Sequence, residues 1–440
     1  MGGCTHTDIV PVAAGRARTQ ANVPKRKCHD RRLGAEMTVP EEHLAGAVRA
    51  VVDPGLFHTL GELGTVRSVR GRRRSTEVVV AVPAAGHPAP HELADEIEKA
   101  VTAAGGAPAE VDLVEMTEAE EADLRARLHE LGRGRVPAAD EEAGRPETGL
   151  AHGHARGDPG AGDSRHGAEG PTPRMNPFSD KASRTRVIAL ASGKGGVGKS
   201  TVTVNLAIAL ALQGASVAIL DADVYGFSIP AMLGIDRSPT LVGDLLVPPG
   251  AHGVRCISMG FFVDEDQAVM WRGPMLHKAL EQFLVDVHWG KPDFLLLDLP
   301  PGTGDVAMSI AQFLPRAEVL VVTTPQAAAE RVAQRAAVLA RQLRLPVRGV
   351  VENQSWFTGD DGKRYELFGR GGGELLAESL GVALLAQIPF LPSLRQGGDS
   401  GVPIAASDPA GEAAQAFSGL AERVVALGPG RVYRSELSVR

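Results

Sequence analysis

Cysteine, aromatic residues and long apolar runs are all scarce in this sequence. Its 440 residues contain three cysteines, Cys4, Cys28 and Cys256, which are too few and too widely spaced for a disulfide scaffold. No apolar stretch approaches the roughly 18 residues that a membrane-spanning helix needs. The formal net charge of -7 provides no overall attraction to nucleic acid or anionic lipid. These absences favour a protein of the reducing cytoplasm that has neither a membrane nor a nucleic-acid partner.

The length and local composition divide the chain into segments. A chain of 440 residues is too long for one ordinary core, so two or more domains are expected. Residues 1–36 are basic but lack the apolar stretch of a signal peptide, so we expect a disordered leader or a true start at Met37. Residues 132–185 are rich in Gly, Pro, Ala, Asp and His and predict a flexible linker, whose histidines (His152, His154 and His166) are read as solvated rather than metal-bound. Residues 429–440 are expected to form a tail.

Residues 37–131 have the pattern of a small α+β domain. Helices are expected over residues 42–51, 91–103 and 118–131, and strands over residues 77–82 and 111–114. Strands that alternate with helices at this size are typical of an α+β unit.

Residues 186–428 contain short, continuous apolar runs separated by helical patterns. Such runs are typical of strands that are buried on both faces. We therefore predict an α/β fold with a doubly wound, mostly parallel sheet. The six strands are expected at residues 187–190, 217–220, 294–297, 319–322, 347–351 and 384–388.

The first of these runs leads into a glycine-rich loop that matches the phosphate-binding pattern GxxxxGK[ST] and is followed by a helix. Glycines allow the backbone to turn its N–H groups toward an anion, and the helix N-terminus adds partial positive charge. Lys199 is expected to bridge the β- and γ-phosphates of ATP, and the Ser200 hydroxyl to hold Mg²⁺. The predicted nucleotide-binding residues are Gly193, Lys194, Gly195, Gly196, Val197, Gly198, Lys199, Ser200 and Thr201.

Acidic residues follow two other predicted strands. Asp221 and Asp223 end one strand and Asp298 ends another, at the sheet edge where ligands bind in open α/β folds. We expect Asp298 to hold Mg²⁺ through water and Asp221 to be structural. The N–H of Gly302, which follows in the Asp298-Leu299-Pro300-Pro301-Gly302 segment, is a candidate sensor of the γ-phosphate.

Besides Lys199, the loop contains Lys194, directly after its first glycine. This lysine resembles the signature lysine of the deviant Walker A superfamily of the nitrogenase iron protein, MinD and ParA. Four further segments in order resemble the Mrp/ApbC family of iron–sulfur cluster carrier ATPases, and residues 51–67 look like the small MIP18-like domain often fused ahead of them. These segments begin at Trp271, Asp298, Phe368 and Gly398.

This resemblance implies a homodimeric, ATP-hydrolysing carrier that serves iron–sulfur apoproteins and works with assembly factors. It also implies that Lys194 reaches across the dimer to the partner's nucleotide, that Asp223 positions the attacking water, and that Asn353 contacts adenine. Lys194, Lys199 and Asp223 are thus the predicted catalytic residues.

The chain departs from this family where the cluster ligands would be. Relatives usually carry Cys-x-x-Cys between the asparagine and the Phe-Gly segment, but residues 355–365 contain no cysteine, and His87-Pro88 stands where relatives often have Cys-Pro. Thiolates are the usual cluster ligands, so the ligands remain unassigned and any [4Fe–4S] cluster is expected to be labile. Cys256 is expected to be a buried core thiol.

Two other classes of function stay open. A MinD- or ParA-like positioning ATPase would need a basic amphipathic C-terminal helix or a basic surface. The helix expected at residues 412–427 has an apolar stripe of Phe417, Leu420 and Val424 with Arg423 as its one cation, so it is expected to pack on the domain. A regulatory ATPase that has lost cluster binding is the third interpretation.

Overall fold

The computed structural model describes residues 39–84, 86–132, 176–180, 182–224, 226–262, 273–302 and 304–430. The predicted leader, most of the predicted linker, including its three histidines, and residues 431–440 lie outside this part of the chain. So do Cys4, Cys28 and the Trp271-Arg272 pair that begins one of the family motifs.

The N-terminal region is an α+β unit, as its sequence pattern predicts. Strand β2 pairs with β1 in antiparallel fashion and with β3 in parallel fashion. Apolar side chains at helical spacing, such as Leu93, Ile97 and Val101, are fully buried against Val78 and Val80 of the sheet. Its elements are α1 (Glu41–Arg49), α2 (Leu60–Leu63), β1 (Val66–Gly71), β2 (Thr76–Val82), α3 (Pro90–Ala103), β3 (Ala109–Glu115) and α4 (Glu118–Gly132).

The C-terminal region contains an eight-stranded sheet in the order β15-β12-β11-β4-β10-β5-β9-β8. All neighbouring strands in it are parallel except β8 and β9. The predicted doubly wound, mostly parallel sheet is therefore confirmed. Its strands are β4 (Arg186–Ser192), β5 (Val217–Asp221), β8 (Gly250–Ala251), β9 (Val254–Ser258), β10 (Phe294–Asp298), β11 (Glu318–Thr323), β12 (Val347–Glu352) and β15 (Ala383–Gln387).

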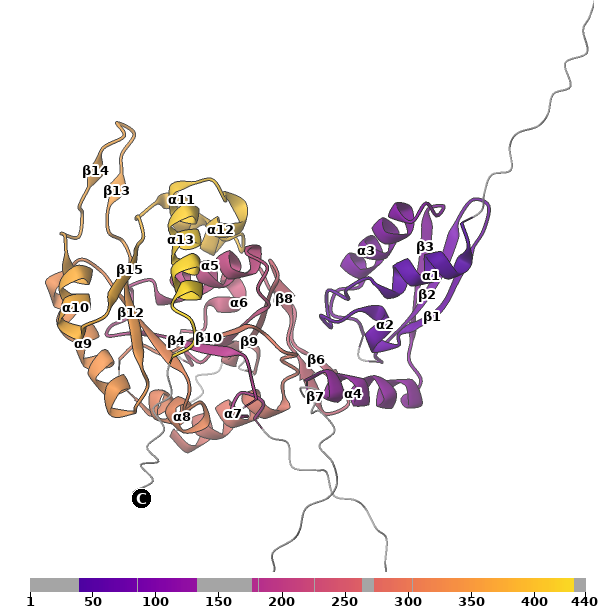
Figure 1. Ribbon diagram of the computed structural model, residues 1–440, viewed down its shortest axis with the longest axis horizontal. Helices are drawn as coiled ribbons and strands as arrows, with labels where there is room; N and C mark the ends of the chain where they lie inside the picture. The colour runs from indigo at the N-terminus through magenta and orange to yellow at the C-terminus, as the bar shows by residue number, and fades with distance from the viewer. Residues whose placement is uncertain are drawn as a thin grey trace, which may run out of the picture. The chain divides into compact units, whose positions relative to one another are not determined.

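Helices cover both faces of this sheet (Figure 1). Along β4, Val187 and Ala189 contribute to one apolar cluster, and the intervening Ile188 and Leu190 contribute to the other. Alternate side chains of a strand point to opposite faces, so a continuous apolar run buries both. The first cluster includes residues of α7 (Gly273–Asp286), α8 (Asp305–Phe313), α9 (Ala327–Gln342) and α10 (Gly372–Leu380); the second includes residues of α5 (Lys199–Leu212), α6 (Ile229–Met232), α11 (Pro392–Asp399), α12 (Ile404–Ser407) and α13 (Glu412–Ala426).

Helix α13 packs on α5 with the apolar stripe that its sequence predicts. Phe417 and Leu420 are 0% exposed and Val424 is 1% exposed. The stripe is therefore used inside the fold and is not available to a membrane. Among the described residues, no helix combines the length and the apolar character that crossing a membrane requires.

Two short hairpins were not predicted from the sequence: β6 (Thr240–Val242) with β7 (Leu245–Val247), and β13 (Phe357–Thr358) with β14 (Arg364–Tyr365). The β13–β14 hairpin occupies the segment where the family resemblance leads one to expect the cysteine pair, and it projects from the body of the domain (Figure 1).

The β13–β14 hairpin is fastened to α13 through Glu412. The Trp356 indole N–H and the Thr358 hydroxyl donate to its carboxylate at 3.0 and 2.9 Å, and Arg364 donates to it at 3.1 Å. The Arg364 guanidinium also lies over the Trp356 ring, 4.2 Å from its centroid. These contacts fix the base of the hairpin.

Candidate nucleotide-binding site

The glycine-rich loop joins β4 to α5 in the geometry of an anion-binding loop. Gly196 and Gly198 adopt φ values of +78° and +79°, in the left-handed region that favours glycine. Gly193 is required for a different reason. A Cβ built on it would lie 2.3 Å from the carbonyl carbon of Val332 in α9, so only glycine lets the two backbones approach this closely.

Lys199, Ser200 and Asp298 converge at the end of this loop, as predicted. The Lys199 ammonium donates to Asp298 Oδ2 at 2.6 Å and lies 3.7 Å from Asp223 Oδ2. The Ser200 hydroxyl donates to the same Asp298 oxygen at 2.6 Å, and Thr203 donates to Asp298 Oδ1 at 2.6 Å. The parallel register that sets Asp298 beside Leu190 brings these groups together. The Ser200 and Thr203 hydroxyls and the Asp298 carboxylate that they contact all present oxygen atoms, and Mg²⁺ prefers such hard oxygen ligands.

Asp221 lies beside this cluster and is 0% exposed. It accepts hydrogen bonds from the Ser258 hydroxyl at 2.9 Å and the Asp223 backbone N–H at 3.2 Å. Burial, followed by the nearby negative charge of Asp298, raises the pKa of Asp221 to about 7. The structural role expected for Asp221 remains a prediction, but its contacts are all within the protein.

Lys194 is held by a residue that the sequence analysis did not identify. Its ammonium donates to Gln326 Oε1 at 3.0 Å, and Gln326 immediately precedes α9. Nothing in the local pattern around Gln326 indicates this contact, because the two residues are 132 positions apart. Thr203, the other residue missed, could have been found, since it lies one helical turn after Lys199 and thus shares its face.

Asn353 directly contacts the phosphate-binding loop. It is 3% exposed, and its Nδ2 donates to the Val197 carbonyl at 2.9 Å. Its Oδ1 is also buried, and the described residues provide it with no hydrogen-bond partner. A buried acceptor left open in this way fits a ligand that donates an N–H, as an adenine amino group does. The predicted adenine contact is chemically consistent with this open acceptor and stays a prediction.

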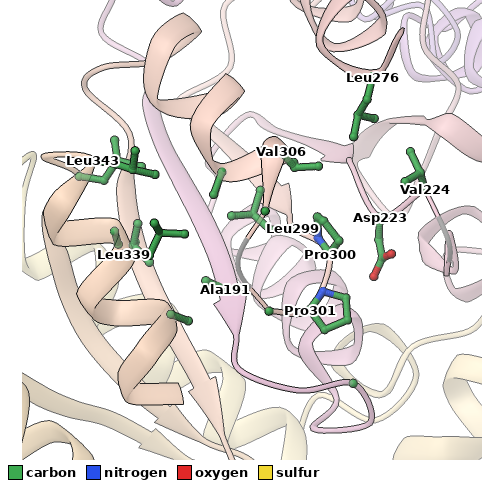
Figure 2. A pocket seen from close by; sticks show the side chains of 18 of the residues that line it. Ala191, Asp223, Val224, Leu276, Leu299, Pro300, Pro301, Val306, Leu339 and Leu343 are labelled. Atoms are coloured by element: carbon green, nitrogen blue, oxygen red, sulfur yellow. The ribbon is translucent and has the colours of Figure 1, made fainter. Parts of the chain in front are cut away.

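A cavity of about 500 Å³ opens beside the loop. Its wall includes Gly195 of the loop, Asp223, and the Pro300, Pro301 and Gly302 backbone that follows β10. Figure 2 shows Asp223 near Pro300 and Pro301, with Leu339 and Leu343 across the cavity. The cavity therefore adjoins the candidate phosphate site and extends along α9.

Gly302 was expected to offer its N–H to a γ-phosphate. In this conformation that N–H donates to the Ser192 carbonyl at 2.9 Å, and Gly302 has a φ of +92°. A sensing role would therefore require this backbone bond to be exchanged.

The described residues contain no cluster of three or more His, Cys, Asp or Glu side chains that could hold a metal ion. Cys256 lies in β9, is 0% exposed, and its burial raises the pKa of the thiol well above its usual range. At His87-Pro88, the pair noted in the sequence analysis, His87 Nε2 lies 2.9 Å from Asp53 Oδ1, and its Nδ1 accepts from the Ala89 N–H at 3.0 Å. Both ring nitrogens of His87 are thus engaged within the protein.

Comparisons with known proteins show the family of the chain. Residues 183–425 match the family model described as ParA: NUBPL iron-transfer P-loop NTPase. A protein of Mycobacterium tuberculosis named iron–sulfur cluster carrier protein is 45% identical over 371 residues, covering 82% of this chain and 87% of the relative. An Escherichia coli protein of the same name is 45% identical over 259 residues, covering 58% and 70%.

Two solved structures are similar to the chain in fold. One is a nucleotide-binding protein from Archaeoglobus fulgidus in complex with ADP, at 36% identity and a TM-score of 0.44, covering 49% of this chain and 86% of that one. The other is the septum site-determining protein MinD from Pyrococcus horikoshii complexed with Mg-ADP, at 28% identity and a TM-score of 0.41, covering 55% and 96%. The family model spans more than half of the chain, and the mycobacterial relative spans most of it at high identity. The chain belongs to the family of NUBPL iron-transfer P-loop NTPases.

Proposed function

We propose that this protein is a cytoplasmic, homodimeric ATPase that carries iron–sulfur clusters to apoproteins. The observation that carries the ATPase part is the convergence of Lys199 and Ser200 on Asp298 at the end of a glycine-rich loop. A buried lysine, a hydroxyl and a carboxylate at this position have the right chemistry to take up Mg-ATP.

The residues of the loop would exchange partners when ATP binds. Lys199 would leave Asp298 and turn its ammonium to the β- and γ-phosphates, while Ser200 and Asp298 would hold Mg²⁺. The Mg²⁺ ion would neutralise phosphate charge. The backbone N–H groups of Gly195, Gly196 and Gly198 would supply further donors, and the open Oδ1 of Asn353 would accept from adenine.

Two residues would assist cleavage of the bond to the γ-phosphate of ATP. Asp223, whose carboxylate lines the cavity beside the loop, would position the attacking water. Lys194 would reach the nucleotide of the second subunit and stabilise charge in the transition state, much as an arginine finger does. Hydrolysis would therefore depend on dimer formation.

The cluster is the cargo in this proposal. Relatives named iron–sulfur cluster carrier proteins and the iron-transfer family model support it. The described residues offer one buried thiol, Cys256, so we assign no cluster ligand and propose that a bound [4Fe–4S] cluster is labile and substoichiometric. Apoproteins and assembly factors are the proposed partners.

The ATPase proposal is tested on the purified full chain by phosphate release and calorimetry. Lys199→Ala should lose ATP binding, whereas Lys194→Ala should keep it and lose turnover by about 10³-fold, the range seen when such a charge is removed from a transition state. Lys363→Ala, which removes a lysine whose side chain is 77% exposed, is the matched control and should match the wild type. Turnover of Lys194→Ala within tenfold of the wild type would rule out the cross-dimer role.

The cargo is tested by anaerobic reconstitution, followed by iron and sulfide analysis and by transfer to an apo iron–sulfur enzyme whose activity reports the cluster. Substoichiometric iron that still activates the acceptor supports a carrier. ATPase activity without iron binding or transfer would instead support the regulatory ATPase, which the lack of a cysteine pair among the described residues favours as the second candidate.

A further inference from the structure

The contact between Lys194 and Gln326 points to a positioning residue outside the glycine-rich loop. We propose that Gln326 holds the Lys194 ammonium within its own subunit until a second copy binds, and so couples ATP hydrolysis to dimer formation. The inference rests on the cross-dimer role of Lys194 proposed above. It assigns to Gln326 a function that none of the sequence motifs indicates.

The position of Gln326 is fixed from several sides. It follows Pro325, which lies two residues beyond the end of β11, and it precedes the first turn of α9, with φ and ψ of -64° and 129°. A Cβ built on Gly372 would lie 2.4 Å from the Pro325 carbonyl oxygen, so the start of α10 presses on this connection. The amide of Gln326 is therefore presented to the loop from a well-supported backbone.

The loop is fixed against the same helix at a second point. The backbone of Gly193, the residue before Lys194, lies close to Val332 and Ala333 in α9, where a Cβ would come within 2.3 and 2.4 Å of backbone atoms. This contact and the 3.0 Å bond from Lys194 Nζ to Gln326 Oε1 both join the loop to α9. The lysine side chain is thus directed along α9 within its own subunit, whereas Lys199 of the same loop points at Asp298.

The chemistry of the acceptor suits a contact that must be exchanged. A lysine has a long, flexible stem, and an amide oxygen can fix its direction. The acceptor is neutral, so it binds the ammonium less strongly than a carboxylate or a phosphate would. The Lys194 ammonium would therefore bind the phosphates of a nucleotide in the partner subunit in preference to Gln326. Without a nucleotide in the partner, it would stay bonded to Gln326.

The test changes the charge of the acceptor in the full-length protein. Gln326→Glu should hold Lys194 more strongly, because an ionised acceptor roughly doubles the strength of such a bond. We expect ATP-dependent dimerisation, measured by analytical ultracentrifugation, to weaken on the order of tenfold, with turnover at low protein concentration falling in parallel. ATP binding to the monomer, measured by calorimetry, should not change. Gln326→Ala should dimerise at least as tightly as the wild type.

The decisive comparison repeats Gln326→Glu in a Lys194→Ala background. If Gln326 acts through Lys194, the glutamate should have no further effect on dimerisation there. An equal effect in both backgrounds would overturn the proposal, as would wild-type behaviour of Gln326→Glu. Gln334→Glu, which places the same charge on an exposed part of α9, is the control and should be neutral.

The outcomes also separate this inference from the proposed function. A Lys194→Ala variant with normal turnover refutes the cross-dimer role and this inference with it. A strongly impaired Lys194→Ala variant combined with a neutral Gln326→Glu variant refutes the role of Gln326 alone.

Discussion

Lys199 is the positive partner of a buried carboxylate, and its replacement should destabilise the protein even without nucleotide. The Lys199 side chain is 6% exposed, and that of Asp298 is 0% exposed. The ammonium lies 2.6 Å from Asp298 and 3.7 Å from Asp223. Lys199→Met keeps most of the apolar stem and removes the charge, so it leaves the Asp298 carboxylate buried with only hydroxyl donors.

The size of the effect follows from this geometry. At an effective dielectric constant of about 20, two unit charges at the Lys199–Asp298 separation attract by about 6 kcal/mol. Desolvation of both groups offsets part of this, and breaking a buried pair from one side costs about 3–5 kcal/mol. We expect Lys199→Met to lower the free energy of unfolding by about 3 kcal/mol at pH 7.

Urea denaturation without nucleotide measures this loss. The double variant Lys199→Met with Asp298→Asn should regain most of the stability, because the neutral amide no longer needs a cation and can still pair with Ser200 and Thr203. It should still fail to bind ATP, which separates stability from ligand binding. Lys363→Met is the exposed control. A Lys199→Met variant within about 1 kcal/mol of the wild type, or a double variant with no recovery, would refute the reasoning.

Three further predictions concern Asp221, Cys256 and Gly193. The pKa of Asp221 is raised to about 7 from 3.8, so its contribution to stability is complete below pH 4 and is lost as the pH rises toward 7. Asp221→Asn should reduce this fall in the free energy of unfolding, measured by urea denaturation, and Asp236→Asn at an exposed position should not. Cys256→Ser should leave iron and sulfide content after anaerobic reconstitution unchanged, and a stoichiometric cluster lost on this substitution would make Cys256 a ligand. Gly193→Ala should weaken ATP binding at least about tenfold by calorimetry, because the added Cβ would collide with the backbone of Val332. An unchanged affinity would mean that α9 can move away from the loop.

Much of the large sheet could be predicted from the sequence, because its strands are buried on both faces. Runs such as residues 217–220 and 294–297 are apolar at every position, and the structure places strands β5 and β10 there. Hairpin β13–β14 could not be predicted in this way. Its strands are two residues long, too short to show any periodicity. They are held by contacts with Glu412, a residue far away in the sequence.

The convergence of Lys199, Ser200 and Asp298 was predictable for a related reason. Lys199 and Ser200 belong to one local pattern, and Asp298 ends a strand that pairs with the strand leading into the loop, so the parallel register brings the carboxylate to them. Gln326 and the Asn353–Val197 bond have no such local signature. Each depends on how segments more than 100 residues apart pack, which only the assembled fold fixes.

The joint at Glu412 has a mechanical consequence. This residue opens α13, the helix that packs on α5, and α5 begins at Lys199. Three hydrogen bonds and a stacked guanidinium join the β13–β14 hairpin to α13 at this residue, so we expect the hairpin to move together with α13. A shift of α5 would then be passed through α13 to the hairpin that projects from the domain.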